Sequence, residues 1–534
     1  MLWVNSGIAM RNFLKFFLPA VALCSCSWLD DDKGQGTFGT ADSVPHDMIV
    51  LGDKLEDPYS VDNVMQAVSF LYPTRAGRVD IKPTDIYVRF LPRTEAEYDR
   101  LVSLGILLID HPIDYQVIRE GDYYHDPSLD EDSITWQYAV VKPDFEFPEG
   151  IRHEVLDKCY ISEHDAATRA EDIDWAAVER EAFRLTGNAC LLQPEVRGAS
   201  EAAKPSGRLC IIDERHGGEP EGIAGVRVSC NTFVKFAHAY TDAQGYYAMD
   251  KEFTSELRYR IVFQNEKGFG IGLNKILVPA SSSTMGKAGP EGVSLTVDKS
   301  SDRRLFTRSV VNNAAYDYFE SCNARDRKIL APPANTRIWL FQSLDVCSTP
   351  MFQQGVLIDD AAIGEFLGEY SKYVKMFLPD ITLGVKDVEE YSTLYAGTVH
   401  ELAHASHFSQ VGKEFWNKYV EYVMASFIES GGRMYGVGSG TGAGHCEVGE
   451  MWGYYMQNRL YKDRYGEDKT TFGTSYWFHP HILLYLDERG LGRSGIFKAL
   501  QPEVTNKNAL QEKLGSLYPE YGIIINQAFD RYDD

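Results

Sequence analysis

The chain lacks several features that define common protein classes. No apolar run reaches the roughly 20 residues that a membrane-spanning helix needs. Positive charge is scarce, with 53 Lys and Arg against 77 Asp and Glu and a net charge of −24, which argues against duplex nucleic acid or an anionic membrane surface as a partner. No internal repeat of about 20–50 residues is visible. The chain is therefore acidic and has ordinary globular composition. Its 534 residues exceed the usual size of a domain with a single hydrophobic core, so more than one domain is expected.

The N-terminal residues have the pattern of an export signal. A short basic segment at 10–15 precedes an apolar run at 16–23, which is too short to span a bilayer. The run ends in Leu-Cys-Ser-Cys, and a leucine three places before a cysteine resembles the lipobox of bacterial lipoproteins. The resemblance implies a lipid anchor at Cys26, with Cys24 as the alternative attachment site.

An acidic cluster follows this segment at 30–32. Its position resembles the export tag of surface-displayed lipoproteins in some Gram-negative bacteria, and a solvated linker is the alternative interpretation. We therefore expect a lipoprotein signal peptide at 1–25, a linker at 26–46 and an outer membrane lipoprotein exposed at the cell surface.

Cysteine is also scarce, with nine in the whole chain. Cys24 lies in the expected signal peptide and Cys26 is the expected lipid-bearing residue, and the rest of the chain is expected in an oxidising compartment. The odd number that remains predicts at least one free thiol. Cys210 and Cys230 lie on strands expected to be neighbours and are the candidates for a disulfide.

The first folded unit is expected at 47–195. Apolar and polar residues alternate at 84–91, which predicts a half-buried strand, and a helix at 95–104 and a strand at 106–110 follow. This pattern indicates an α/β domain. It contains no motif that indicates chemistry, so its role is unknown.

Residues 205–300 have the pattern of a small β-sandwich, with short strands separated by turns that contain glycine. Gly-Val-x-Val at 225–228, Thr-Asp-x-x-Gly-Tyr at 241–246 and Tyr-x-Ile-x-Phe at 259–263 resemble the carboxypeptidase regulatory-like family. The resemblance implies an Ig/transthyretin-like sandwich that is an accessory module and not a catalyst.

The residues at 304–534 are expected to form a mainly helical domain. Helices are predicted at 304–322, 361–378, 391–408, 412–430, 446–461, 480–488 and 495–501. A strand is predicted at 336–341, and its residues 338–341 offer an edge with which an extended peptide can pair. The fold class is therefore multidomain α+β, with an α/β unit, a sandwich and a helical domain.

The helix predicted at 391–408 contains His400-Glu401-Leu402-Ala403-His404. Histidines at i and i+4 lie on one helix face one turn apart, so both imidazoles can bind a single Zn²⁺ ion. Glu401 follows the first histidine directly and is the candidate general base for a zinc-bound water. The alternative is a helix face with two ordinary histidines.

A third ligand is needed, and His407 does not supply it. It lies seven residues after His400, or about 10 Å along the helix axis, too far to share a metal ion. A metzincin carries glycine at this place and histidine three residues later, where this chain has Gln410, so that family is excluded.

The third ligand is expected on a later helix. Glu450-Met451-Trp452-Gly453 resembles the Glu-x-aromatic-small segment that holds the third ligand in gluzincin metallopeptidases. The resemblance implies Glu450 as the ligand, with Glu447 as the alternative. Whichever glutamate is not the ligand is a candidate to orient a ligand histidine.

Two further segments flank this helix. The glycine-rich run at 436–444 follows a helix and not a strand, which argues against a dinucleotide loop and favours a mobile loop beside the site. Downstream, Tyr476, His479 and His481 are candidates for stabilising a tetrahedral oxyanion, with core packing and helix capping as alternatives.

These patterns together resemble a gluzincin-type zinc metallopeptidase. The resemblance implies zinc-dependent hydrolysis of peptide bonds in extracellular proteins or peptides, with His400, His404 and Glu450 as metal ligands. The alternative is a catalytically inactive surface lipoprotein that binds glycan or protein through its β-sandwich.

Overall fold

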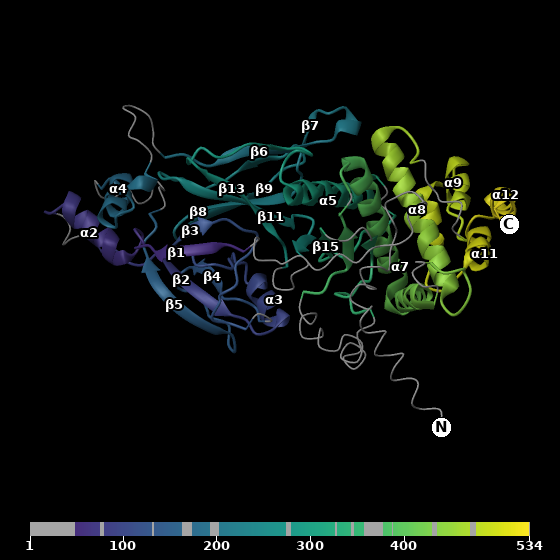
Figure 1. The fold of residues 1–534 in the computed structure, drawn as a ribbon, viewed down its shortest axis with the longest axis horizontal. Helices are drawn as coiled ribbons and strands as arrows, with labels where there is room; N and C mark the ends of the chain where they lie inside the picture. The colour runs from purple at the N-terminus through teal and green to yellow at the C-terminus, as the bar shows by residue number, and fades with distance from the viewer. Residues whose placement is uncertain are drawn as a thin grey trace, which may run out of the picture.

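The computed structural model describes residues 48–74, 80–130, 133–162, 173–192, 202–273, 279–325, 328–342, 347–356, 377–386, 388–429, 435–469 and 477–532. The predicted signal peptide, lipid anchor and linker lie outside these residues, as does almost all of the helix predicted at 361–378. Within the described ranges, no helix has both the length and the apolar character needed to cross a membrane. Figure 1 shows an elongated molecule with the N-terminal elements at one end, a β-rich centre and the C-terminal helices at the other end.

The N-terminal unit contains a three-stranded antiparallel sheet, in which β2 (Asp85–Leu91) lies between β4 (Gln137–Val141) and β5 (Arg152–Cys159). Helix α3 (Glu95–Ser103) follows β2, and its N-terminus is capped by Thr94, whose side chain accepts a hydrogen bond from the N–H of Glu97. The predicted strand and helix are thus confirmed. The other elements are β1 (Val50–Lys54), β3 (Tyr115–Arg119), α2 (Val61–Leu71), α4 (Trp175–Leu185) and the 3₁₀ turn Ala189–Leu191.

The strand predicted at 106–110 is wrong. This segment makes a single bridge between Ile109 and Tyr138 and forms no ladder. Its end is held by side-chain bonds instead, since the Asp110 carboxylate accepts a hydrogen bond from the Tyr124 N–H and pairs with the His111 ring at 2.8 Å.

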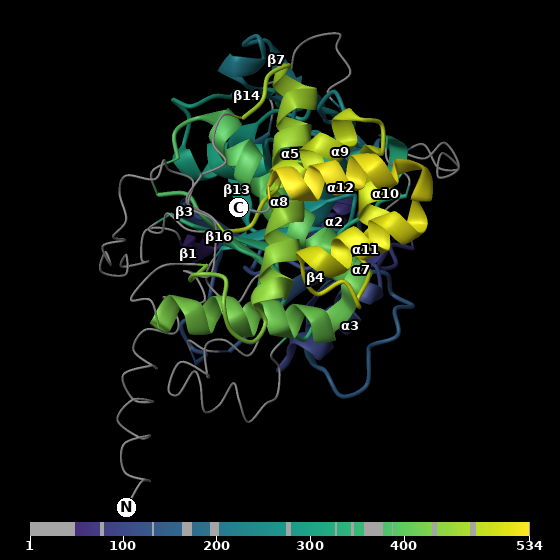
Figure 2. The same ribbon diagram turned by 90° about the vertical axis from the view of Figure 1, so that its right-hand side faces the viewer.

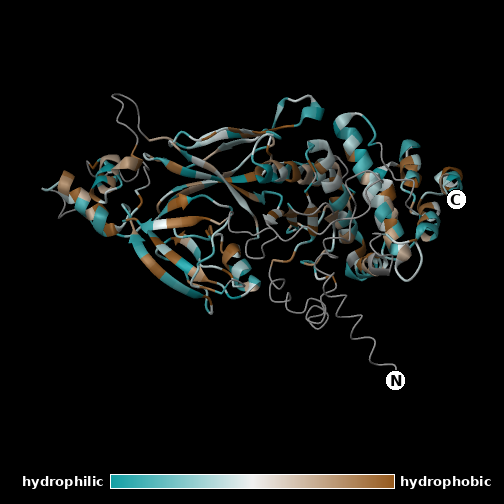
Figure 3. Cartoon of the chain, viewed as in Figure 1, coloured by the Kyte–Doolittle hydropathy of each residue, from teal (hydrophilic) through white to brown (hydrophobic). Residues whose placement is uncertain are grey.

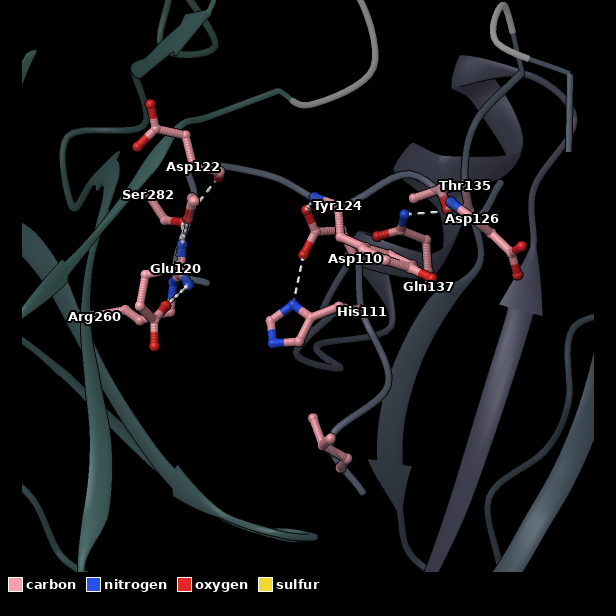
Figure 4. A network of polar contacts seen from close by, with 12 residues as sticks. Asp110, His111, Glu120, Asp122, Tyr124, Asp126, Thr135, Gln137, Arg260 and Ser282 are labelled. Carbon is pink, nitrogen blue, oxygen red and sulfur yellow. Dashed lines mark hydrogen bonds and ion pairs between the residues drawn. The ribbon is translucent and has the colours of Figure 1, made fainter. Parts of the chain in front are cut away.

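A network of charged side chains joins this unit to the β-rich centre. Glu120 accepts hydrogen bonds from Arg258 at 2.9 and 2.5 Å, and it also pairs with Arg260. Asp122 accepts two hydrogen bonds from the buried Arg308, at 3.1 and 2.9 Å. Figure 4 shows Glu120 beside Arg260, on the side that faces β11. Bidentate arginine–carboxylate pairs specify orientation, so the network fixes how the N-terminal unit docks.

The residues predicted as a sandwich form short strands in two sheets. The strands are β6 (Ser206–Ile212), β7 (Pro220–Gly222), β8 (Val226–Thr232), β9 (Lys235–Tyr240), β10 (Tyr246–Ala248), β11 (Leu257–Asn265), β12 (Gly270–Leu273), β13 (Ser282–Ala288) and β14 (Leu295–Val297). One sheet has the order β10-β6-β14, with β7 paired to β6. The other contains β9, β8, β11 and β13. Buried residues of both sheets belong to one hydrophobic cluster.

The predicted pairing of Cys210 with Cys230 is wrong. Cys210 lies on β6 and Cys230 on β8, and these strands belong to different sheets. Cys230 instead contacts Met249, with 3.2 Å between the two sulfur atoms. No disulfide joins any of the seven cysteines in the described part of the chain, and Cys190 is exposed.

A single sheet connects the strands of residues 206–297 to the C-terminal part. Strand β12 pairs with β11 on one side and, in parallel, with β15 (Arg337–Phe341) on the other. Beyond β15 follow β17 (Ile381–Gly384) and β16 (Cys347–Ser348), which gives eight strands in this sheet. The predicted boundary near residue 300 therefore falls between two regions that share a sheet.

The prediction that residues 338–341 offer a peptide-binding edge is wrong. Strand β15 lies inside the sheet, between β12 and β17, and four of its five residues are buried. Such a continuous buried pattern is typical of a central parallel strand. In the described part of the chain, β16 is the terminal strand on this side and pairs antiparallel with β17.

The C-terminal part is mainly helical. Its helices are α5 (Arg303–Glu320, continued by a π turn at Ser321–Arg325), α7 (Tyr391–Glu429), α8 (Ala443–Tyr465), α9 (His481–Glu488), α10 (Gly492–Ala499), α11 (Lys507–Leu517) and α12 (Gly522–Arg531). Gly412 interrupts α7 with a φ of 78°, so the two helices predicted at 391–408 and 412–430 are its two halves. Figure 2 shows α8 crossing α7, with α9 to α12 gathered beside it. Helices α11 and α12 were not predicted.

Hydrophobic residues hold these layers together. They run along the central strands, whereas the C-terminal helices alternate hydrophobic and hydrophilic residues (Figure 3). One cluster extends from Leu209 on β6 through α5 to Phe529 on α12, while the N-terminal unit has smaller clusters of its own.

One buried acidic group in the N-terminal unit carries a pH dependence. The Asp57 carboxylate is 8% exposed, accepts a hydrogen bond from the Tyr59 N–H and lies 3.8 Å from the Cys159 sulfur. Burial, reinforced by the neighbouring charges of Asp157 and Asp114, raises the pKa of Asp57 to about 7. The folded state therefore favours the protonated acid.

Since the folded-state pKa of Asp57 lies above the unfolded value, its contribution to stability is present at low pH and is lost as pH rises toward 7. We expect Asp57→Asn, which keeps an acceptor oxygen, to increase the free energy of unfolding more at pH 8 than at pH 4.5. The gain should be about 1.4 kcal/mol for each unit by which the pKa of Asp57 is higher in the folded than in the unfolded state. Chemical denaturation at the two pH values measures this. Asp53→Asn, at an exposed position on β1, is the control, and equal effects of both variants would contradict the assignment.

Candidate metal centre

Three side chains from two helices meet inside the helical part. His400 and His404 lie on the first half of α7, and Glu450 lies on α8. The Nε2 atoms of the two histidines are 2.9 Å apart. Each Nε2 atom lies 3.4 Å from one oxygen of Glu450. These residues form a group that could hold a metal ion.

The absence of a side chain at Gly453 allows this approach. A Cβ atom at Gly453 would lie 2.8 Å from a carbon of the His404 ring and 2.9 Å from Nε2 of His400. Real Cβ atoms do not approach other atoms so closely. Gly453 is three residues after Glu450, so it lies on the same face of α8.

The distances fit a tetrahedral metal ion. Donor atoms bound at about 2.1 Å in a tetrahedron lie about 3.4 Å from one another, which matches both histidine–glutamate distances. The distance of 2.9 Å between the Nε2 atoms of His400 and His404 is shorter than this, and a small rotation of the rings would lengthen it. Two imidazoles and one carboxylate are the donor set of catalytic zinc sites, which keep the fourth position open. The group therefore fits Zn²⁺.

Polar partners orient two of these donors. The Nδ1 atom of His400 is 3.1 Å from the side-chain oxygen of Gln457, so Nδ1 carries the proton and Nε2 presents its lone pair. The Tyr419 hydroxyl donates to Oε1 of Glu450 at 2.5 Å. Gln457 lies two helical turns after Glu450, a spacing readable from sequence, whereas Tyr419 has no such signal.

The electrostatics favour an ionised Glu450 between two unlike imidazoles. Burial alone would raise the pKa of Glu450, but His404 and His400 outweigh it and hold that pKa far below the usual range. Burial lowers the pKa of His400, and the neighbouring His404 adds to this effect. Burial alone would also lower the pKa of His404, but the carboxylates of Glu450 and Glu401 outweigh it and raise that pKa. A neutral imidazole beside an ionised carboxylate is the protonation state that binds a cation.

Glu447, the alternative ligand, lies outside the group. Its carboxylate accepts a hydrogen bond from the N–H of Lys507, 2.8 Å away at the start of α11. The group instead contains Glu450, which is fully buried. Glu447 thus binds a helix N-terminus, where a carboxylate is stabilised by unpaired N–H groups.

Glu401, the predicted general base, is also buried. The Thr349 hydroxyl lies 2.7 Å from its Oε2 atom. His400, Glu401 and His404 are each 1% exposed and Glu450 is 0% exposed. Beside them lies a narrow pocket whose wall includes Thr349 and Tyr419 together with Pro350, Phe352, Val420, Val423 and Met424. Its free volume of about 10 Å³ is close to that needed for one water molecule.

The other candidate residues lie in different surroundings. His407 is buried against the rings of Phe415 and Trp416, and burial lowers its pKa to about 3. His481 stacks on Tyr532 of α12 with 5.6 Å between ring centres, and the His479 backbone carbonyl accepts a hydrogen bond at the start of α9. The ring contact of His481 matches the core-packing alternative to an oxyanion role, and the hydrogen bond of His479 matches the helix-capping alternative. Tyr476 lies outside the described residues.

No protein-family model and no curated protein matches the chain. Among solved structures, the chain is similar to a 9R-lipoxygenase from Cyanothece PCC8801, at 10% identity and a TM-score of 0.12. The similarity covers 27% of this chain and 28% of that one. So weak a likeness carries no argument about fold or function.

Removing either glutamate tests which one binds metal. We expect Glu450→Ala to lose stoichiometric zinc, because it deletes a donor and leaves two imidazoles. Glu447→Ala should keep its zinc and destabilise the start of α11, by about 1 kcal/mol. Metal content after dialysis, measured by mass spectrometry, decides between them. The reverse order would overturn the assignment.

Gly453→Ala tests the close approach of the two helices. The added methyl group must displace the His400 and His404 rings, so we expect zinc affinity to fall by at least about 10-fold. Competition with a chromogenic chelator measures the affinity. Gly515→Ala on α11 is the matched control, since an added Cβ meets nothing within 4 Å there. Equal zinc affinity in both variants would show that Gly453 does not limit the site.

Proposed function

We propose that the protein is a zinc-dependent, gluzincin-like metallopeptidase that hydrolyses peptide bonds in extracellular proteins or peptides. The observation that supports this most is the meeting of His400, His404 and Glu450, with Glu401 next to the first histidine. Three protein donors with an open fourth position are typical of catalytic zinc and not of structural zinc.

Each residue of the site has a separate role in this proposal. His400, His404 and Glu450 would hold the ion, and Gln457 and Tyr419 would orient two of these donors. A bound zinc ion supplies a Lewis acid that polarises the scissile carbonyl and makes water more acidic. Glu401 takes a proton from the attacking water and later passes it to the leaving amine.

The predicted export signal indicates the cellular location of this activity. With a lipid anchor at Cys26, the protein would act as an outer membrane lipoprotein at the cell surface, and the sandwich would serve as an accessory module. A net charge of −24 suits exposure to solvent there.

A rival function is favoured by the burial of the site. All four functional side chains are at most 1% exposed, as expected if the metal were structural and the protein bound a glycan or protein through its sandwich. The two functions differ in what Glu401 does, because a structural zinc site does not need a general base.

Glu401→Gln therefore separates the two functions. The change removes the base and preserves the shape, so we expect cleavage of a peptide library to fall by about 10²–10⁴-fold, with zinc content unchanged. Mass spectrometry of the library products measures cleavage, and chelator-treated wild type is the control for metal-independent hydrolysis. Equal cleavage by wild type and variant would remove Glu401 from the reaction, and no cleavage by wild type would favour the binding protein.

A further inference from the structure

Thr349 connects the edge strand of the long sheet to the candidate general base. It is the residue directly after β16, and it is 3% exposed. Its hydroxyl oxygen lies 2.7 Å from Oε2 of Glu401 and 2.9 Å from the backbone carbonyl oxygen of Glu401. Fifty-two residues separate the two in sequence, so only the fold brings them together.

Thr349 is itself held in place from two sides. Its carbonyl oxygen accepts a hydrogen bond from the Trp416 indole at 2.8 Å. The preceding residue, Ser348, pairs with Thr382 of β17 through the backbone, and their hydroxyls are 2.7 Å apart. Trp416 is fully buried and lies 5.8 Å from the His404 ring. The hydroxyl that reaches Glu401 therefore extends from a rigid part of the structure.

A fixed donor has a definite effect on a glutamate side chain. Three rotatable bonds separate the carboxylate from the backbone, and a general base must present one oxygen within hydrogen-bond reach of the proton it takes. A hydrogen bond to one oxygen stops the carboxylate from turning. It also makes that oxygen the less basic of the two, which assigns the proton to the other oxygen.

We propose that Thr349 is a positioning residue, whose hydrogen bond to Oε2 of Glu401 orients the carboxylate so that Oε1 takes the proton from water. This inference rests on the proposed peptidase function. It adds a residue that the His-Glu-x-x-His motif does not contain. Thr349 is not one of the residues that could hold the ion, and in this proposal it acts only through Glu401.

The half of α7 after Gly412 supports the base and the ligand separately. Trp416 holds Thr349, which holds Glu401, whereas Tyr419 donates directly to Glu450. The two rings are stacked, with 4.5 Å between their centres. Loss of the Thr349 hydroxyl should therefore affect proton transfer, and loss of the Tyr419 hydroxyl should affect zinc binding.

Thr349→Val is the test, because it removes the hydroxyl and keeps the shape of the side chain. For the best peptide from the library, we expect kcat to fall by about 10–100-fold and KM to change by less than about twofold. Zinc affinity should stay within about twofold of wild type. Thr349→Ser, which restores a hydroxyl, should recover most of kcat.

A binding measurement adds a readout that does not depend on turnover. Leucine hydroxamate carries an acidic proton that the base beside the metal accepts, so its affinity for zinc-loaded protein should fall about 10-fold in Thr349→Val, as measured by calorimetry. Thr307→Val on α5 is the matched control. It makes the same substitution at another buried threonine, whose hydroxyl donates to the Arg303 carbonyl within its own helix, and it should leave kcat and hydroxamate affinity unchanged. Tyr419→Phe should instead weaken zinc affinity by about 10-fold.

Several outcomes would overturn the inference. If Thr349→Val keeps wild-type kcat while Glu401→Gln is inactive, the peptidase proposal stands and the role of Thr349 falls. If Thr349→Val and Thr307→Val lose kcat equally, or if Thr349→Ser does not recover activity, the Thr349 hydroxyl only stabilises the fold. If Glu401→Gln remains active, the peptidase mechanism falls first.

Discussion

The close packing of α7 against α8 is the constraint on which the candidate metal centre depends. Gly453 lets the two helices approach until the rings of His400 and His404 face the carboxylate of Glu450. A carboxylate buried this completely is costly unless it is paired and hydrogen-bonded. The two imidazoles and the Tyr419 hydroxyl supply those partners, and a bound cation would complete them.

The break in α7 at Gly412 determines which residues of its second half reach the candidate site. Its positive φ breaks α7, so the half of the helix that follows can bring Trp416 and Tyr419 to the centre. These two residues reach the site by different routes, one through Thr349 to Glu401 and one directly to Glu450. One structural break thus determines the surroundings of both candidate carboxylates, Glu401 and Glu450.

The eight-stranded sheet connects the candidate site to the rest of the molecule. Strand β12 joins β11 to β15, and the same sheet ends at β16, which precedes Thr349. The β-rich centre is therefore continuous with the strands beside the candidate site. The arginine–carboxylate network around Glu120 and Asp122 in turn fixes the N-terminal unit on this sheet. Rigid support of this kind is what a site needs to hold donors at fixed distances.

The sequence alone determined the local part of this description. Helical periodicity predicted the two halves of α7, and the i, i+4 spacing of His400 and His404 predicted a shared face, because both depend only on near neighbours. Glu450 was favoured over Glu447 by resemblance, and only packing shows which glutamate joins the group. The tertiary structure alone decided the contacts of Thr349, Tyr419 and Gly453, and the different sheets of Cys210 and Cys230. It also placed β15 inside the sheet, since strand order and side-chain contacts between distant segments depend on how the layers assemble, which local periodicity does not encode.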